Sequence, residues 1–389
     1  MTDKTILFYP SGHGFGHAVR QSEIIKEIFK YNIKNNRAHK VIVRTSAPEW
    51  IFKKSLELYF NKLYPGGFEK ISGWFSYYYA QNDVGTIQKD SLNMDIDLTF
   101  SAACDFYFNL DQRAAREAEF IKFHNVDLVA GDIPPLAFAA ADKAGVNSIG
   151  VTNFSWDYIY EEFISDNPGF SEVIDIIQGA YSKCGRLLKL PFACPLPAFK
   201  EISPVGMIAR RPYIESGEVF NLLSLNRSEF EGKTTVMISF GGFDTAGIIY
   251  ENLAAYKDEF MFLTTMPPEA GKKFPGCVKY IDTASCGVSF ENLFNIFDII
   301  VTKPGYGVVG DILGAGAMCL YTDRGRFSEY EYLVNFLEKH SVSSVYITRD
   351  EIMNCDFKSK INKLTARRKE PEAINLDGAR ECAMAIINE

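Results

Sequence analysis

Two glycine-rich segments, one in each half of the chain, carry the residue types best suited to chemistry. The first reads SGHGFGH at positions 11–17, and the second reads KPGYG at positions 303–307. Each follows an apolar run typical of a strand and precedes a run typical of a helix. Such a turn presents free backbone amides and the positive end of a helix dipole, which together favour an anionic ligand. We therefore expect one binding site in each half, facing a cleft between two domains.

The first segment also carries two imidazoles. Gly12, Gly14 and Gly16 allow a ligand to approach the backbone closely, but their Gly-x-Gly-x-Gly spacing departs from the dinucleotide fingerprint and disfavours a nicotinamide oxidoreductase. Because an imidazole titrates near neutral pH, His17 at the expected helix start is our candidate general base. His13 is assigned to substrate contact. The alternative is that both histidines only cap a helix and fill a turn.

Asp132 is the candidate carboxylate partner of this base. It follows an apolar run at 127–130, and the carboxyl ends of the strands line the ligand crevice of a doubly wound sheet. A carboxylate there would fix the tautomer of His17 and stabilise the imidazolium formed during reaction. The alternative is that Asp132 is the N-cap of the helix that follows.

Composition narrows the class of protein. The 389 residues fit two or three domains, and the net charge of -8 with a pI near 5.4 argues against a nucleic-acid surface. The eight cysteines form no C-x-x-C pair, so we interpret them as reduced core thiols. A signal peptide and a membrane-spanning run are not expected. We expect a soluble, cytoplasmic enzyme, and peripheral membrane contact through the aromatic and lysine-bearing stretch 50–79 stays open.

Strand-like and helix-like runs alternate in both halves, which is the pattern of parallel sheets covered by helices. Five prolines between positions 190 and 212 interrupt the alternation and favour extended backbone. We therefore place an N-terminal domain at 1–195, a linker at 196–212 and a C-terminal domain at 213–389, and a return of the last helix to the first domain stays open. The expected strands are 6–9, 40–44, 127–130, 148–151, 234–240, 261–265, 298–301 and 318–321. The expected helices are 18–29, 48–58, 110–123, 134–144, 246–256, 308–315 and 328–339.

Several segments together resemble a known family. SGHGFGHAVRQSEI at the first glycine turn, VRTSAPEW from Val43, DVGTIQKDSL from Asp83 and GVTNFSWDYIY from Gly150 resemble the glycosyltransferase-like N-terminal part of plant arabinokinases and its bacterial relatives. DIIVTKPGYGVVGDILGAGAMCLY from Asp298 resembles the donor-site motif of that group. The layout is more distantly similar to the peptidoglycan N-acetylglucosaminyltransferase and to a nucleotide-sugar hydrolase of pseudaminic acid synthesis. The resemblance covers most of the chain but no kinase domain.

This resemblance implies an α/β protein with the GT-B fold: two doubly wound Rossmann-like domains whose parallel sheets face a central cleft. In such enzymes the first domain mainly binds the acceptor and the second mainly binds the nucleotide sugar. A histidine that closes the glycine turn acts as base, and His17 matches it. The resemblance thus implies a glycosyltransferase, which we expect to be inverting and metal-independent. A nucleotide-sugar hydrolase or epimerase, or a noncatalytic nucleotide-sugar-binding protein, is the alternative.

Candidates for acceptor binding gather in three segments of the first half. Segment 83–91 mixes carboxylates, hydroxyls and an amide beside an aromatic run at 74–79, and segment 153–157 directly follows a strand-like run. Aromatic faces stack on the apolar faces of sugars, although any single aromatic side chain can instead belong to the core. The acceptor, a small molecule or a lipid-linked glycan, is not identified. The acceptor candidates are Gly12, His13, Gly14, Asp83, Gln88, Asp90, Asn153 and Trp156.

The second glycine-rich segment is the candidate donor site. Its hydroxyl, ammonium and free amides suit a diphosphate, although a plain strand-to-helix turn is the alternative. Carboxylates in the segment 322–331 resemble those that hold ribose or sugar hydroxyls in such enzymes, and a solvated loop is the alternative there. We expect no cofactor and no catalytic metal, since the Asp95-Ile96-Asp97 spacing lies in the acceptor half. The donor candidates are Gly241, Gly242, Thr302, Lys303, Pro304, Gly305, Tyr306, Gly307, Arg324, Glu329 and Glu331.

Overall fold

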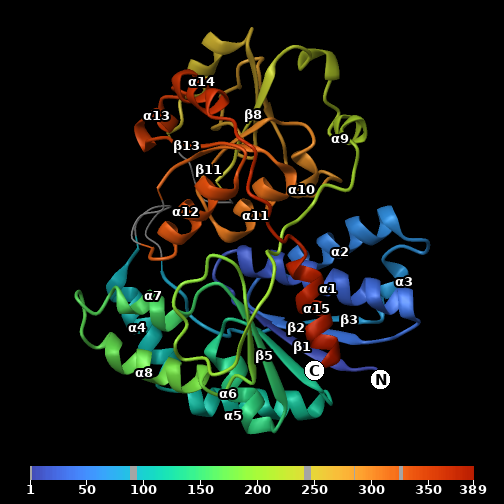
Figure 1. Ribbon diagram of the computed structural model, residues 1–389, viewed down its shortest axis with the longest axis vertical. Coiled ribbons are helices and arrows are strands. Elements are labelled where there is room, and N and C mark those ends of the chain that lie inside the picture. The colour runs from blue at the N-terminus through green and yellow to red at the C-terminus, as the bar shows by residue number, and fades with distance from the viewer. Residues whose placement is uncertain (1, 88–93, 241–246, 284, 324–326) are drawn as a thin grey trace.

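The computed structural model describes residues 2–87, 94–240, 247–283, 285–323 and 327–389. Two parallel sheets, one in each half of the chain, lie one above the other with helices around them (Figure 1). The first sheet has seven strands in the order β3-β2-β1-β4-β5-β6-β7, and the second has six in the order β10-β9-β8-β11-β12-β13. The α/β class with two doubly wound parallel sheets is therefore confirmed.

The first sheet is buried on both faces because helices cover each side. Ile6 and Phe8 of β1 belong to one cluster of buried side chains, whereas Leu7 and Tyr9 belong to the other. This alternation makes the central strands continuous apolar runs, as in other parallel sheets. The elements are β1 (Thr5–Pro10), α1 (Gly16–Asn35), β2 (Lys40–Thr45), α2 (Glu49–Leu63), α3 (Glu69–Ser72), β3 (Phe75–Tyr79), α4 (Ile96–Tyr107), α5 (Leu110–Phe123), β4 (Leu128–Asp132), α6 (Pro135–Ala144), β5 (Asn147–Thr152), α7 (Trp156–Glu161), α8 (Phe170–Tyr181), β6 (Arg186–Lys189) and β7 (Ile202–Pro204).

The second half repeats this arrangement with shorter helices. The helix expected at 246–256 is wrong: Gly247 has a φ of 99°, outside the helical range, and a 3-10 helix begins only at Tyr250. The elements are α9 (Ser216–Leu222), η1 (Arg227–Glu229), β8 (Thr234–Ile238), η2 (Tyr250–Tyr256), β9 (Phe260–Thr264), β10 (Val278–Tyr280), α10 (Phe290–Leu293), β11 (Ile299–Thr302), α11 (Tyr306–Ala315), β12 (Met318–Tyr321), α12 (Tyr330–His340), β13 (Ser344–Tyr346), α13 (Arg349–Met353), α14 (Lys358–Ala366) and α15 (Gly378–Asn388).

Two stretches of chain connect the halves. The expected linker 196–212 contains β7, which pairs with β6, so the first sheet reaches Pro204 and only the residues after it cross over. On the way back, Ile208 bridges Asp377, and α15 then packs against α1 (Figure 1). The C-terminal helix thus belongs spatially to the first sheet.

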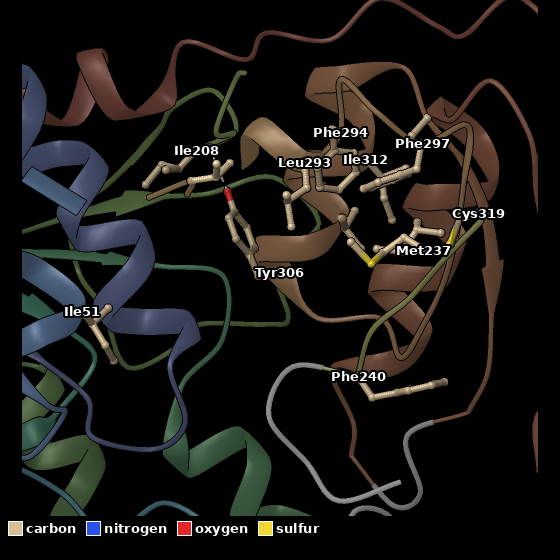
Figure 2. Packing of buried hydrophobic residues seen from close by; sticks show 14 of the residues in the cluster. Ile51, Ile208, Met237, Phe240, Leu293, Phe294, Phe297, Tyr306, Ile312 and Cys319 are labelled. Carbon is tan, nitrogen blue, oxygen red and sulfur yellow. Dashed lines mark hydrogen bonds between the residues drawn. The ribbon is translucent and has the colours of Figure 1, made fainter. Parts of the chain in front are cut away.

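Buried apolar side chains continue from one half to the other. Ile51 of α2, Ile208 of the crossover and Tyr306 of α11 belong to one cluster that also includes the core of the second sheet (Figure 2). Because apolar burial is the main favourable term in folding, this shared core holds the two halves together. Among the residues that the structure describes, no helix is both long and apolar enough to cross a bilayer.

Candidate functional site

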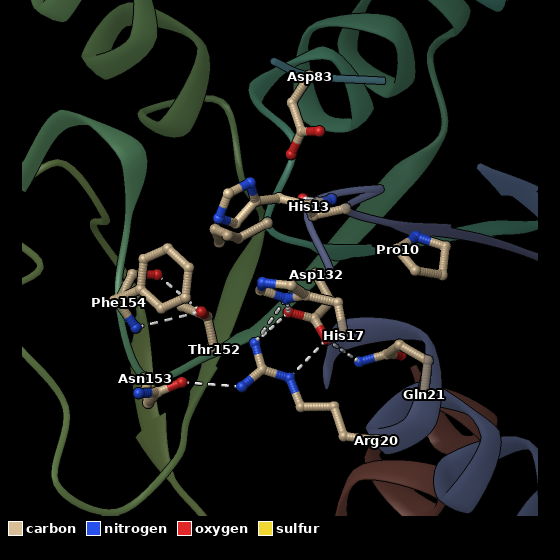
Figure 3. Close-up of polar contacts among 12 residues, drawn as sticks. Pro10, His13, His17, Arg20, Gln21, Asp83, Asp132, Thr152, Asn153 and Phe154 are labelled. Atoms are coloured by element: carbon tan, nitrogen blue, oxygen red, sulfur yellow. Dashed lines mark hydrogen bonds and ion pairs between the residues drawn. The ribbon is translucent and has the colours of Figure 1, made fainter. Parts of the chain in front are cut away.

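The ends of β1 and β4 bring His17 and Asp132 together. These strands pair directly, with Pro10 opposite Asp132, and α1 begins just after the glycine turn that follows β1. His17 Nδ1 lies 2.9 Å from Asp132 Oδ1, and both side chains are buried (Figure 3). A carboxylate only accepts hydrogen bonds, so this geometry assigns the proton to Nδ1 and leaves Nε2 as the basic nitrogen.

Two further residues of α1 hold the same carboxylate. Arg20 Nε donates to Asp132 Oδ2 at 2.6 Å, Arg20 Nη2 donates to Oδ1, and Gln21 Nε2 donates to Oδ2 at 2.7 Å (Figure 3). Burial would raise the pKa of Asp132, but the charges and hydrogen bonds of Arg20 and His17 hold it well below its usual range. Asp132 is therefore ionised at neutral pH and can stabilise an imidazolium at His17.

The N-cap alternative for Asp132 is wrong, because the N-cap of α6 is Pro134 and no side chain caps that helix. Sequence reasoning missed Arg20 and Gln21. The signal was present: residues three and four positions after His17 lie on the same face of a helix. Reading the helix face downstream of the histidine would have found both.

The three glycines of the first turn serve different needs. A Cβ on Gly12 would lie 1.9 Å from Ser46 Oγ, so this glycine permits close packing against the chain after β2. Gly14 has a φ of 70°, which side-chain-bearing residues rarely adopt. Within the part of the chain that the structure describes, a Cβ on Gly16 would meet no atom outside its own helix and its chain neighbours within 4 Å, and no side chain caps the start of α1. The open, uncapped end of α1 beside His17 is thus the part of the turn that can receive a ligand.

Asp83 and Trp156 hold this turn from the other side. Trp156 Nε1 donates to Asp83 Oδ2 at 2.9 Å, and the ring of His13 lies edge-on to Trp156 at 5.3 Å. Burial raises the pKa of Asp83, although hydrogen bonds from Ser11 and Trp156 and the nearby His17 oppose the shift. Because Trp156 has no exposed surface, it positions the loop and does not offer a free stacking face.

The second glycine turn follows β11 as expected. Gly305 is the N-cap of α11, no side chain caps this helix and no acidic residue lies in its first turn. Among the described residues, and apart from its chain neighbours and its own helix, a Cβ on Gly305 or Gly307 would meet no atom within 4 Å. Thr302 and Pro304 are buried and Lys303 is half-buried. The open side of this turn can therefore receive an anion at the helix N-terminus.

Comparisons with known proteins bear on the whole chain. No known protein-family profile matches it. L-arabinokinase of Arabidopsis thaliana is 28% identical over 352 residues, which are 89% of this chain and 31% of that protein. The chain thus spans about a third of the curated relative it matches. The solved structure of CalG4, the calicheamicin glycosyltransferase, covers 100% of this chain and 95% of its own, with a TM-score of 0.60 and 12% identity.

Two further solved structures agree. Arabidopsis thaliana UGT89C1 covers 99% of this chain and 94% of its own, with a TM-score of 0.58 and 15% identity. Acinetobacter baumannii MurG covers 99% of this chain and 100% of its own, with a TM-score of 0.52 and 11% identity. This chain has the GT-B glycosyltransferase fold. The resemblance recognised in the sequence is confirmed: the chain is a distant homologue of plant L-arabinokinase over most of its length.

The GT-B fold puts acceptor and donor candidates on different sheets, yet two of them are in contact. Asn153, expected on the acceptor side, follows β5, and Glu329, expected on the donor side, precedes α12. Asn153 Nδ2 donates to Glu329 Oε1 at 2.6 Å, and Arg20 Nη1 donates to Asn153 Oδ1 at 2.8 Å. Both Asn153 and Glu329 are buried, whereas Glu331 is exposed on the first turn of α12. The two halves of this GT-B protein therefore meet beside the His17–Asp132 pair.

Tyr306, a donor candidate, also takes part in the junction between the two halves. Its hydroxyl accepts a hydrogen bond from the Ile208 amide at 3.2 Å (Figure 2). Its ring lies 5.0 Å from the Arg20 guanidinium. It is buried at the junction of the two halves. Its side chain therefore braces the junction, and the glycines on either side of it carry the open surface.

Some candidates lie outside the described residues, and one cavity was not anticipated. Beyond the described part of the chain are Gln88, Asp90, Gly241, Gly242 and Arg324. A cavity of about 120 Å³ lies between η2 and the chain after β9. Tyr250, Phe274 and Met266 line it with lysines and glutamates of opposite charge, and none of the predicted residues does. No spacing signal marks such a cavity in the sequence, because it depends on how two loops pack.

Proposed function

We propose that this protein is an inverting, metal-independent glycosyltransferase that moves a sugar from a nucleotide-diphosphate sugar to an acceptor hydroxyl. The observation that carries the proposal is the buried His17–Asp132 pair, 2.9 Å apart, at the uncapped start of α1. An ionised carboxylate on Nδ1 leaves Nε2 free to act as general base. The GT-B fold supports glycosyl transfer as the class of reaction. Arabidopsis thaliana UGT89C1, which shares this fold, has been solved in complex with UDP.

The reaction then follows from these positions. His17 Nε2 takes the proton of the acceptor hydroxyl while its oxygen attacks the anomeric carbon of the donor sugar. The bond from that carbon to the diphosphate oxygen breaks, and the nucleotide diphosphate leaves with the bonding electrons. Because the oxygen attacks opposite to the leaving group, the anomeric configuration inverts. Asp132 stabilises the imidazolium, and the amides at Gly305 and Gly307 with the α11 dipole receive the departing charge.

Metal independence rests on the chemistry of the donor turn. The helix dipole, the open amides and the nearby Lys303 can neutralise a diphosphate. In the Asp95-Ile96-Asp97 spacing, the Asp95 side chain accepts from the Leu98 amide at 3.0 Å and caps α4. That aspartate therefore has a structural use in the first half of the protein.

A screen followed by two paired variants tests the function. Nucleotide sugars are first screened by thermal shift, and a binding donor is then incubated with candidate acceptors. We expect His17→Ala to lower turnover by about 10²- to 10⁴-fold while the donor-induced thermal shift stays unchanged. The matched control is His124→Ala, a histidine that packs against Tyr78 and Phe120 away from the site. Near-normal turnover by His17→Ala would refute the assignment of the base, and release of free sugar from donor alone would instead indicate a hydrolase.

The donor turn has its own test. Gly305→Val adds a Cβ that no described residue other than its chain neighbours approaches within 4 Å, so the fold should tolerate the change, whereas the added side chain should obstruct a bound diphosphate. We expect weaker nucleotide binding with little change in thermal stability. Gly276→Val is the control, since a Cβ there also meets nothing within 4 Å. Equal donor affinity in both variants would exclude this turn as the diphosphate site.

A further inference from the structure

A continuous chain of hydrogen bonds joins the second half of the protein to the proposed base. It runs from Glu329 to Asn153 at 2.6 Å, from Asn153 to Arg20 at 2.8 Å, from Arg20 to Asp132 at 2.6 Å and from Asp132 to His17 at 2.9 Å. All five side chains are buried. Figure 3 shows Asn153, Arg20, Asp132 and His17 in this order. Contact between the halves is thus linked directly to His17.

The chemistry of each group fixes the direction of every bond. The guanidinium of Arg20 only donates, and the carboxylate of Glu329 only accepts. The amide of Asn153 therefore has one satisfactory orientation, with Oδ1 toward Arg20 and Nδ2 toward Glu329. A carboxylate from the second half of the chain thus orients an amide that in turn holds one end of the guanidinium.

The second half acts on Arg20 in another way. The ring of Tyr306 lies 5.0 Å from the guanidinium, within the range of a cation–π contact. Burial lowers the pKa of Arg20, but Asp132, Tyr306 and Glu329 raise it above its ordinary value. Arg20 is therefore charged, and two residues of the second half help to hold it.

The position of Arg20 decides which nitrogen of His17 carries the proton. Arg20 Nη2 donates to Asp132 and also lies 3.1 Å from His17 Nδ1. Nδ1 can donate to Asp132 or accept from Arg20, but it cannot do both. If Nδ1 accepted from Arg20 instead of donating to Asp132, the proton of the neutral ring would lie on Nε2, which could then no longer act as a base.

We propose that Asn153 is a positioning residue through which Glu329 keeps the guanidinium of Arg20 directed at Asp132, so that His17 Nδ1 donates to Asp132 and His17 keeps its basic tautomer. The inference rests on the proposed function for its meaning, because only a general base needs a free Nε2. Its consequence is that the base is competent when the two halves are seated against each other. The pair would lose this preference when that contact opens.

Nitrogen-15 NMR of the imidazoles tests the tautomer without substrate. The chain has five histidines, and His17→Gln assigns the signal of His17 by its disappearance. Spectra are recorded above the pH at which the ring protonates, where the two tautomers give distinct pairs of nitrogen resonances. We expect the wild type to show the proton on Nδ1. In Asn153→Ala the tautomer ratio should move toward Nε2–H by about tenfold or more, the effect expected of losing a hydrogen bond to a charged group.

Three further variants separate coupling from general damage. Glu329→Ala should move the ratio in the same direction, whereas Glu329→Gln, which can still accept from Asn153, should keep the wild-type ratio. Lys62→Ala is the matched control, because it breaks the exposed ion pair between Lys62 and Glu218. This pair is 2.6 Å long and joins α2 to α9, and neither residue belongs to the chain of hydrogen bonds from Glu329 to His17. This variant should leave the signal of His17 unchanged.

The outcomes are decisive for variants whose thermal unfolding is cooperative. A wild-type tautomer in Asn153→Ala or in Glu329→Ala overturns the inference, and so does an equal change in Lys62→Ala. If Asn153→Ala does not fold, Glu329→Ala alone decides, because it leaves the Asn153–Arg20 bond in place. A changed tautomer together with an active His17→Ala would uphold this coupling while refuting the proposed base.

Discussion

The carboxylate of Asp132 offers the sharpest test of how the site is held together. Asp132→Asn keeps the size of the side chain but removes the charge that Arg20 contacts through Nε and Nη2. Arg20 is only 3% exposed and Asp132 is fully buried, so water cannot replace the lost partner. Breaking a buried ion pair by removing one member costs about 3–5 kcal/mol. Since folded domains are stable by about 5–15 kcal/mol, the loss should be large.

Urea unfolding, followed by tryptophan fluorescence, measures the loss. Arg20→Met and the double variant Arg20→Met with Asp132→Asn complete a double-mutant cycle. We expect the double variant to be more stable than Asp132→Asn alone, because it leaves no unpaired charge in the interior. The control is Lys62→Ala, whose ion pair has 37% and 42% of its two side chains exposed, and whose removal should cost at most about 1 kcal/mol.

Two results would refute this reasoning. If Asp132→Asn were as stable as Lys62→Ala, the buried guanidinium of Arg20 would not need the carboxylate of Asp132 to stabilise its charge. If the two single losses simply added in the double variant, the side chains would contribute independently. Either result would also remove the physical basis for an ionised Asp132 beside His17.

Further predictions concern pH and the first glycine turn. Burial raises the pKa of Asp311 to about 6 from its ordinary 3.8, with Arg210 lowering it and Glu291 raising it. The folded state then binds this proton more tightly than the unfolded state, so the stability it contributes is full below about pH 4 and is lost by about pH 6. Between these pH values the wild type should lose about 3 kcal/mol of its free energy of unfolding, whereas Asp311→Asn, measured by urea unfolding, should not show this loss. If the free energy of unfolding depended on pH in the same way in variant and wild type, the raised pKa of Asp311 would be contradicted. Gly12→Ala, whose Cβ would lie 1.9 Å from Ser46 Oγ, should lower the free energy of unfolding by about 1–3 kcal/mol. The Cβ of Gly16→Ala meets no atom of the described residues outside its own helix and chain neighbours within 4 Å, so this change should not lower the free energy of unfolding. Equal effects of the two changes would show that the contact of the Gly12→Ala methyl with Ser46 is relieved by a small movement.

Residue patterns were sufficient for much of this fold because the strands are central and parallel. All five residues of β4 are buried, and the first three, Leu128, Val129 and Ala130, form an apolar run that stands out between two helix-like segments. The strands that were missed are short or lie toward the edges, such as β7 with three residues and a proline at its end. A proline cannot donate to a sheet, so the pattern around β7 indicated a linker even though all three residues of β7, Pro204 included, pair with β6.

The sequence predicted the proximity of site residues that belong to one sheet, but not the contacts between residues from different halves of the protein. His17 comes soon after β1 and Asp132 ends the neighbouring strand β4 of the same sheet, so their proximity follows from the order of strands in a doubly wound fold. Asn153 and Glu329 were assigned to opposite sides of the protein, and their contact depends on how the halves dock. No periodicity records that docking, and the buried position of Tyr306 was unpredictable for the same reason.

The role of α1 follows from combining these observations. The helix has 20 residues, about 30 Å at 1.5 Å per residue, and it bears His17 and Arg20 on its first turns. Farther along it, Lys26 Nζ lies 2.8 Å from Glu23 and 3.8 Å from Glu291 of the second half, and α11 and α15 also pack against it. One rigid element therefore carries both the proposed base and a large part of the junction between the halves. A movement of the second half that repacked this junction would act on α1 itself, and the Asn153–Arg20 contact would transmit it to the imidazole.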